Sequence, residues 1–322
     1  MKRRDLNLAM ISMGVFPALS LAQTTYPSRP IRLIVPFPPG GGADNLARIV
    51  MPKVAEILGQ PIIIDNKPGA GGNVGSEQAA RATADGYTLL YGTNGTHGIN
   101  HALYSRTGFE LRDFSTVGRV SFIPAVLVVN PSVPVDSVPQ FLAYLKANPD
   151  KVSYASAGNG TTSHMAGEAF KRQANVDIQH IPYKGGGAAL TGLIAGEVQM
   201  MIDLAANLMP QVRAGKLKAL AVTSRQRLAS RSDLPTLDEI GLKGFDLVAS
   251  DGIYAPSGTP QPIIEKFNQA LNRALGDSEI VERLRSRGAE PIRGTPQEHL
   301  AHITREFPVW TRLVKDVGAK VD

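Results

Sequence analysis

IRLIVPFPPGGGAD, residues 31–44, is a short apolar run followed by a glycine-rich turn. Residues 31–36 predict a buried strand, and the amphipathic stretch after the turn predicts a helix that continues to about Leu58. Further apolar runs predict the next strands, at 61–65, 87–91, 152–155, 178–181, 198–202 and 217–223. A repeated strand, turn and helix unit predicts an α/β fold with mostly parallel sheets.

Two longer extended runs, at 117–130 and 247–255, interrupt this pattern. We interpret each as a strand that crosses from one lobe of the protein into another. The prediction is a discontinuous first lobe, residues 23–122 plus 252–322, that is hinged to a continuous second lobe, residues 123–251. We expect the C-terminal helices, at 261–275, 278–287 and 296–317, to pack back onto the first sheet.

Residues 1–22 predict a secretory signal peptide. Lys2, Arg3 and Arg4 precede an apolar stretch at 8–21 that ends in small residues. A permanent anchor is the weaker interpretation, because a membrane-spanning helix needs about 20 apolar residues. The pattern predicts export and leaves open whether the general secretion route or the twin-arginine route is used.

Composition argues against several classes of function. The chain has 322 residues and a formal charge of +6, which falls to +4 when 1–22 and their three basic and one acidic side chains are removed. Basic residues are scattered rather than clustered, so nucleic acid is not an expected partner. With Cys 0, there are no disulfides, thiolate metal sites or cysteine nucleophiles. We expect no cofactor and no metal.

Several turns at the predicted carboxyl ends of strands carry small and polar residues. In open parallel sheets, ligands bind at these ends, where helix N-termini present unpaired backbone N–H groups. Backbone amides and hydroxyls that face each other across a cleft suit a carboxylate. Asp203 ends an apolar strand, where a ligand contact and a structural role are both open. The candidate ligand-binding residues are Pro39, Gly40, Gly41, Asp44, Thr93, Asn94, Thr96, Ser156, Gly158, Asn159, Thr161 and Asp203.

Other motifs point more weakly to other functions. The turn at 69–75 nearly matches a dinucleotide-binding fingerprint but has Val74 where the third glycine is required. His97 and His101 have a helical i, i+4 spacing, for which ordinary packing is a better explanation than a metal. Ser156, with His164 and Asp203, allows an exported serine hydrolase, although no Gly-x-Ser-x-Gly elbow surrounds any serine.

The chain resembles the Bug-type receptors of tripartite tricarboxylate transport systems. This resemblance implies a type II periplasmic-binding-protein fold, with two lobes on a hinge and the ligand in the cleft between them. It also implies a periplasmic monomer without enzymatic activity that delivers a small carboxylate to membrane permease subunits; a sensory receptor is an alternative. The segments that carry the resemblance are 26–31, 36–44, 84–90, 154–158, 182–185, 215–223 and 255–260.

The resemblance places the ligand-contacting loops at 37–44, 93–96 and 156–162. It implies a carboxylate held by backbone amides, hydroxyls and bridging waters, with ligands that range from amino acids and citrate-like acids to aromatic carboxylates. Many relatives carry a Trp before a glycine near the second crossing, where this chain has Asp251-Gly252. A carboxylate there would repel a second ligand anion or favour a cationic group.

Overall fold

The computed structural model describes residues 26–228, 231–319 and 321. The predicted signal peptide, residues 1–22, therefore lies outside the described residues. In the described part of the chain, none of the helices has both the length and the apolarity needed to cross a bilayer.

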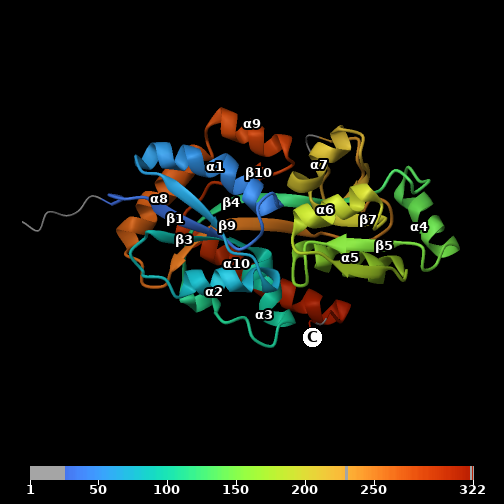
Figure 1. Ribbon diagram of the computed structural model, residues 1–322, viewed down its shortest axis with the longest axis horizontal. Coiled ribbons are helices and arrows are strands. Elements are labelled where there is room, and N and C mark those ends of the chain that lie inside the picture. The colour runs from blue at the N-terminus through green and yellow to red at the C-terminus, as the bar shows by residue number, and fades with distance from the viewer. Residues whose placement is uncertain (1–25, 229–230, 320, 322) are drawn as a thin grey trace, which may run out of the picture.

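Strands and helices alternate along most of the chain (Figure 1). The strands are β1 (Ile31–Val35), β2 (Ile62–Asn66), β3 (Thr88–Thr93), β4 (Phe114–Val129), β5 (Ser153–Ser156), β6 (Gln179–Pro182), β7 (Met200–Leu204), β8 (Lys218–Val222), β9 (Val248–Pro256) and β10 (Glu290–Pro291). The α-helices are α1 (Gly42–Leu58), α2 (Asn73–Ala80), α3 (Asn100–Leu103), α4 (Val138–Ala147), α5 (Thr162–Ala174), α6 (Gly186–Ala195), α7 (Ala205–Arg213), α8 (Gln261–Ala274), α9 (Ser278–Ser286) and α10 (Pro296–Val317). Three short helical turns are η1 (Ala70–Gly72), η2 (Gly95–Ile99) and η3 (Leu111–Asp113).

The strands form one curled sheet in the order β2-β1-β3-β9-β4-β7-β5-β6, and β8 and β10 also pair with β4. The α/β prediction is confirmed. The two ends of the sheet are parallel, but β9 is antiparallel to β3, and β4 is antiparallel to β7, β8, β9 and β10. The expectation of mostly parallel pairing was therefore wrong for the centre of the sheet, because the two extended runs enter it as antiparallel neighbours.

β4 connects the two ends of the sheet (Figure 1). Its residues 114–124 pair with β9, and its residues 125–129 pair with β7 and β8. We call β2, β1, β3, β9 and the start of β4 the first half of the sheet, and the end of β4 with β8, β7, β5 and β6 the second half. The lobe ranges expected from the sequence stay a prediction, but the change of partner at 124/125 lies close to the predicted boundary at 122/123.

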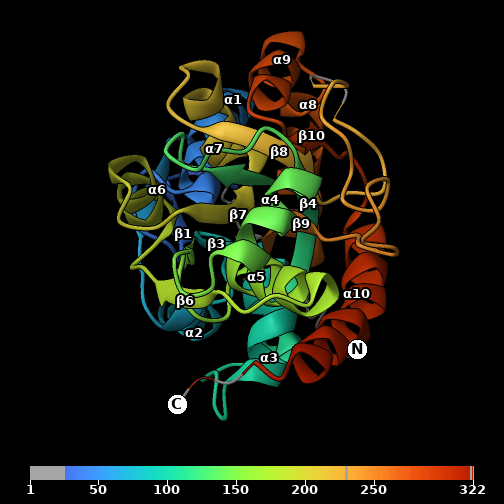
Figure 2. The same cartoon turned by 90° about the vertical axis from the view of Figure 1, so that its right-hand side faces the viewer.

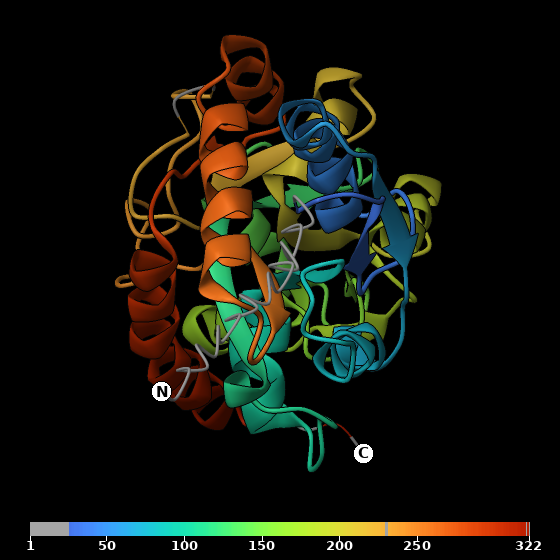
Figure 3. The same cartoon turned by 90° about the vertical axis from the view of Figure 1, so that its left-hand side faces the viewer.

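Helices cover both halves. α8 packs against α1 and β4 and is the long orange helix of Figure 3, and α9 also contacts α1. α10 contacts β4 and η2, as expected of a helix that packs onto the first half, and it also contacts α5 of the second half (Figure 2). Trp310 of α10 is buried in the same apolar cluster as Phe141 and Phe170.

Local signals explain where several helices begin. Thr295 and Glu298 form a capping box that starts α10, and the Thr161 side chain accepts a hydrogen bond from the His164 N–H at the start of α5. α2 begins at Asn73, inside the segment 69–75 that was interpreted from the sequence as a turn. Gly72 makes this possible, because its φ of 100° turns the chain directly into the helix.

Thr223 joins the two crossing segments. Its hydroxyl accepts from the Ala125 N–H of β4 at 3.0 Å and lies within hydrogen-bond distance of the carbonyl oxygens of Ala125 and Leu247. Its backbone N–H also donates to the Ala125 carbonyl, and it is 0% exposed. Thr223 therefore fixes the end of β4 to the residue that precedes β9.

We expect Thr223→Val to lower the free energy of unfolding by about 1–3 kcal/mol, because the buried Ala125 N–H loses its partner while the side-chain volume hardly changes. Urea unfolding monitored by circular dichroism measures this. Thr191→Val is the matched control, since the exposed Thr191 hydroxyl bonds only the Gly187 carbonyl of its own helix. Equal losses in the two variants would contradict the role of Thr223.

Candidate functional site

A cavity of about 60 Å³ lies between the two halves of the sheet. It is smaller than the roughly 300–1,000 Å³ of ordinary small-molecule pockets, and side chains of the two halves touch across it. Among the residues that the structure describes, no Lys or Arg lines it. The lining residues are Phe37, Gly41, Gly42, Ala43, Thr93, Asn94, Gly95, Ala157, Thr161, Thr162, Ser163, Gly186, Asp203, Leu204, Ala249 and Asp251.

Helix starts from both halves open on this cavity. α1 contributes its N-cap Gly41, α5 contributes its N-cap Thr161, and α6 contributes its first residue, Gly186. Leu204, the N-cap of α7, also lines the cavity. The first N–H groups of a helix lack intrahelical partners and carry partial positive charge. The cavity therefore offers an anion several backbone donors without a basic side chain.

Asp44 shapes the first of these helix starts. Its carboxylate accepts hydrogen bonds from the Gly40 N–H at 2.9 Å, from Arg48 at 2.9 Å and from the Asn66 amide at 3.0 Å. Although burial opposes it, these bonds lower the pKa of Asp44 below its usual value. The Asp44 carboxylate is buried beneath the turn that precedes α1, and it does not line the cavity. Pro39 and Gly40 are exposed at the tip of this turn.

The second-half loop is organised in a similar way. The Ser156 hydroxyl is 2.7 Å from His180 Nε2 and accepts from the Gly158 N–H at 3.1 Å. Ser156 is 0% exposed, and these two contacts, one from β6 and one from its own loop, occupy its hydroxyl. Thr161 donates to the Gly158 carbonyl at 2.6 Å, which leaves Thr161, Thr162 and Ser163 on the cavity wall.

The three residues of the hydrolase alternative do not come together as a triad. His164 accepts from the Gly160 N–H at 3.3 Å, and Asp203 accepts from the Asn207 amide at 2.8 Å. The nearest histidine to Ser156 is instead His180, which sequence reasoning missed. Burial lowers the pKa of His180 to about 3.

Direct contacts bridge the two halves around the cavity. Thr162 donates to the Asn94 side-chain oxygen at 3.1 Å, and the Tyr104 hydroxyl donates to the Asn159 carbonyl at 2.9 Å. Thr93 and Thr96 bond each other across the turn after β3, where Thr96 is fully buried and only Thr93 reaches the cavity. These contacts describe a conformation in which the two sides of the cavity touch.

Two buried polar atoms on the cavity-lining side chains have no hydrogen-bond partner within the described residues. They are Nδ2 of Asn94, a donor, and Oδ1 of Asp251, an acceptor. The other oxygen of Asp251 accepts from the Tyr91 hydroxyl at 2.9 Å. Burial raises the pKa of Asp251 to about 7 and that of Asp203 to about 6, because ionised carboxylates lose water there.

The structure thus brings five of the predicted residues to one cavity: Gly41, Thr93, Asn94, Thr161 and Asp203. Asp44, Thr96 and Ser156 instead lie buried behind the cavity wall, and Pro39 and Gly40 are exposed at the tip of the turn before α1. Gly158 and Asn159 line an adjoining groove of about 510 Å³ that shares Phe37 and Ala157 with the cavity. Sequence reasoning missed Leu204 and Ala249, whose apolar character gave no signal.

The two histidines with helical spacing pack against aromatic rings. His97 stacks on Tyr254 at 3.8 Å between ring centroids, and His101 meets Phe109 edge-on at 5.2 Å. Over residues 26–228, 231–319 and 321, there is no group of three or more His, Asp or Glu side chains placed to hold a metal ion.

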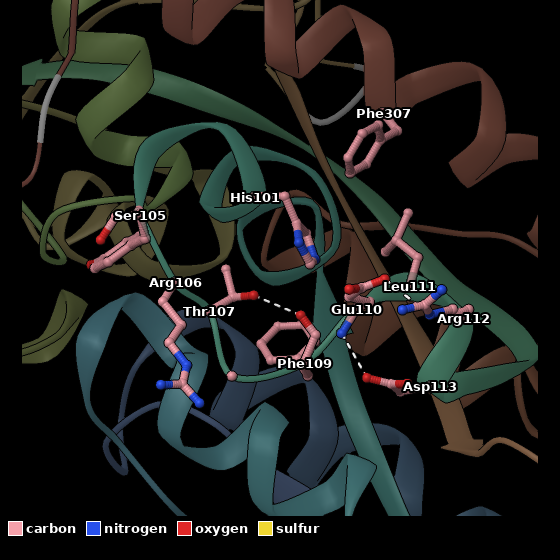
Figure 4. Close-up of a pocket in the computed structure, with 12 residues that line it drawn as sticks. His101, Ser105, Arg106, Thr107, Phe109, Glu110, Leu111, Arg112, Asp113 and Phe307 are labelled. Atoms are coloured by element: carbon pink, nitrogen blue, oxygen red, sulfur yellow. Dashed lines mark hydrogen bonds and ion pairs between the residues drawn. The ribbon is translucent and has the colours of Figure 1, made fainter.

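A larger hollow of about 690 Å³ lies between the loop after α3 and Phe307 of α10 (Figure 4). It contains none of the predicted site residues. Its Glu110 and Arg112 pair with each other at 3.0 Å, and Thr107 bonds the Phe109 carbonyl of its own loop. Its charged groups are therefore partly neutralised within the loop, and the cavity between the sheet halves is the better candidate site.

The chain is similar over most of its length to several known proteins. Protein BugT of Bordetella pertussis is 35% identical over 316 residues, which cover 96% of this chain and 97% of BugT. The solved periplasmic binding protein BugD is 36% identical with a TM-score of 0.88 over 92% of this chain and 99% of that chain. An R. palustris protein solved with adipate is 35% identical with a TM-score of 0.89, over 92% of this chain and 100% of that chain.

These likenesses confirm the expected two-lobed periplasmic-binding-protein fold. The model of the tripartite tricarboxylate transporter family receptor matches residues 46–319, which include most of the cavity wall. The chain therefore belongs to the tripartite tricarboxylate transporter receptor family.

Proposed function

We propose that this protein is a periplasmic receptor that binds a small carboxylate in the cavity between its lobes and delivers it to the permease subunits of a tripartite transporter. The observation that carries the proposal is the convergence of the N-termini of α1, α5 and α6 on one cavity. The amide of Asn94 adds a buried donor that has no partner within the described residues. A carboxylate would supply acceptors to the Asn94 amide and to the N–H groups at these helix starts.

Two further observations support this ligand class. The R. palustris protein of similar fold was solved with adipate, a dicarboxylate. Each hydrogen bond to a charged group contributes roughly 1.5–3 kcal/mol, so a few of them account for binding in the micromolar range. Phe37, Leu204 and Ala249 would contact the carbon chain of the acid.

Binding is coupled to closure of the lobes. The Thr162–Asn94 and Tyr104–Asn159 hydrogen bonds form only when the two sides of the cavity meet. A ligand held by helix starts from both sides stabilises that closed state relative to the open one. The permease then recognises the closed surface. Export to the periplasm is supported by the basic and apolar segments of residues 1–22 and by the family.

We expect at least one acid in a thermal-shift screen of dicarboxylates, tricarboxylates, aromatic acids and amino acids to raise the melting temperature. A ligand that binds only the native state adds about 2.7 kcal/mol of stability at a concentration 100-fold above its Kd. The absence of a shift with every acid, at millimolar concentration, would contradict the proposal.

Gly41→Val is expected to abolish binding of the acid identified in that screen, because the added side chain would stand where the ligand approaches the start of α1. The fold should survive, since φ at Gly41 is −73° and a Cβ would meet only the Pro38 carbonyl oxygen at 3.5 Å. Isothermal titration calorimetry measures the affinity, with Thr191→Val as the control. Wild-type affinity in Gly41→Val would remove this loop from the site.

The hydrolase alternative has its own test, because Ser156 and His180 are hydrogen-bonded. We expect the protein to hydrolyse 4-nitrophenyl acetate no faster than its Ser156→Ala variant. The serine is buried, and the low pKa of His180 makes its imidazole a weak base at neutral pH. Ester turnover that disappears in Ser156→Ala would instead support an enzyme.

Uptake of the radiolabelled acid distinguishes a transport receptor from a sensory one. Cells that lack the receptor should lose uptake and regain it with the wild-type gene, but not with Gly41→Val. Unchanged uptake in the deletion strain, together with co-purification of a membrane sensor, would favour the sensory alternative.

A further inference from the structure

Asp251 is an unusual group to find at a carboxylate-binding cavity. It lines the cavity, is 2% exposed, and is accompanied by a second buried carboxyl group, Asp203. The two differ in their partners: Asp203 accepts from the Asn207 amide at 2.8 Å, whereas Oδ1 of Asp251 has no partner within the described residues. A buried carboxylate oxygen without a partner is costly, so Oδ1 of Asp251 is a vacant acceptor that a donor on the ligand can fill.

The position of Asp251 relative to Asn94 indicates what that donor is. Asp251 of β9 stands directly opposite Thr93 of β3 in the sheet, and Asn94 follows Thr93. Cross-strand partners are about 4.5–5.5 Å apart between their Cα atoms, so the two side chains arise from neighbouring positions. One presents an unsatisfied donor and the other an unsatisfied acceptor.

We propose that the ligand carries an ammonium group close to its carboxylate, as an α-amino acid does, and that Asp251 is the residue that selects for it. The carboxylate binds Asn94 and the helix starts, and the ammonium binds Asp251. This inference rests on the proposed function and adds the ligand class to it. The Tyr91 hydroxyl holds the second oxygen of Asp251 in place for this contact.

The charge of the cavity agrees with this assignment. No Lys or Arg in the described part of the chain lines the cavity, so a ligand with two negative charges would meet two buried carboxyl groups and no basic side chain. A zwitterion brings the cation that Asp251 lacks and the anion that the helix N-termini favour.

The test compares acids that differ only by an ammonium group: propionate with L-alanine, succinate with L-aspartate, and glutarate with L-glutamate. Calorimetry on the wild-type protein should show a preference of roughly 10- to 100-fold for the ammonium-bearing member of at least one pair, as expected of one charge-assisted bond. L-malate and 4-aminobutyrate are added to separate a hydroxyl donor and a distant ammonium from an adjacent one.

Asp251→Asn is the decisive variant. The amide keeps the shape and an oxygen that accepts from Tyr91, but it cannot neutralise a cation. We expect this variant to lose the ammonium preference and to retain or gain affinity for the paired acid without nitrogen. Asp177→Asn is the matched control, because it removes the same charge from a side chain that is 101% exposed, beyond the C-terminal end of α5. It should behave as the wild type does.

The protons released when the ligand binds give a second measurement of the role of Asp251. Burial raises the pKa of Asp251 to about 7, and a bound ammonium favours its ionised form, so binding at pH 7 should release protons to the buffer. Calorimetry in buffers of different ionisation enthalpy measures this release, which should disappear in Asp251→Asn. The titratable and charged groups near Asp251 are Tyr91, Asp203, Tyr254, Arg119 and His299.

These experiments distinguish a failure of the role of Asp251 from a failure of carboxylate binding itself. Several results would overturn the role of Asp251 and leave the carboxylate receptor intact. They are tight binding of the nitrogen-free acids without an ammonium preference, and an ammonium preference that survives Asp251→Asn. The others are stronger binding of L-malate than of L-aspartate, stronger binding of 4-aminobutyrate than of L-alanine, and proton uptake on binding. If none of these acids and none in the wider screen binds, both proposals fail.

Discussion

The backbone of strand β4 must find hydrogen-bond partners along its whole length, and this requirement joins the two halves of the sheet. β4 has 16 residues, too many for a single partner of ordinary length, and it satisfies its backbone by pairing with β9 along one part and with β7 and β8 along the other. The two halves of the sheet are therefore joined by continuous backbone. Thr223 ties the end of β4 to Leu247, so the second crossing segment follows the first.

This connection determines where the functional turns lie. Parallel strands at each end of the sheet direct the starts of α1 and α5 to the same cavity, although Gly41 and Thr161 are 120 positions apart in the chain. Buried side chains then hold each turn from behind: Asp44 does so for the first-half loop, and Ser156 with His180 for the second. The cavity therefore offers backbone N–H groups from both halves of the sheet to an anion, and no Lys or Arg among the described residues lines it.

Two cavity atoms without a partner among the described residues, Nδ2 of Asn94 and Oδ1 of Asp251, make the cavity more selective between ligands. Backbone amides favour any anion, whereas Asn94 and Asp251 present one donor and one acceptor at neighbouring positions. Discrimination between ligands arises where a buried polar group would be left without a partner by the wrong ligand. In this chain, the departure at Asp251 is therefore more informative about the ligand than the glycine-rich turns are.

The strand, turn and helix units, the two crossing segments and the candidate turns could be predicted from local patterns such as residues 31–44, because hydrophobic periodicity and glycine act over a few residues. Gly41, Thr93, Asn94, Thr161 and Asp203 were predicted in this way and share one cavity. Antiparallel pairing at the centre of the sheet could not be predicted, because strand partners are chosen by contacts far apart in sequence.

The sequence by itself determined the α/β class, the absence of cysteine chemistry and the turns that carry small polar residues, since each depends on residue type and short spacing. Only the tertiary structure decided that Asp44 and Ser156 lie behind the cavity wall and that Ser156 meets His180 rather than His164. It also decided that one oxygen of Asp251 finds no partner among the described residues. The physical reason is burial: whether a polar group finds a partner inside the protein depends on which distant segments pack around it.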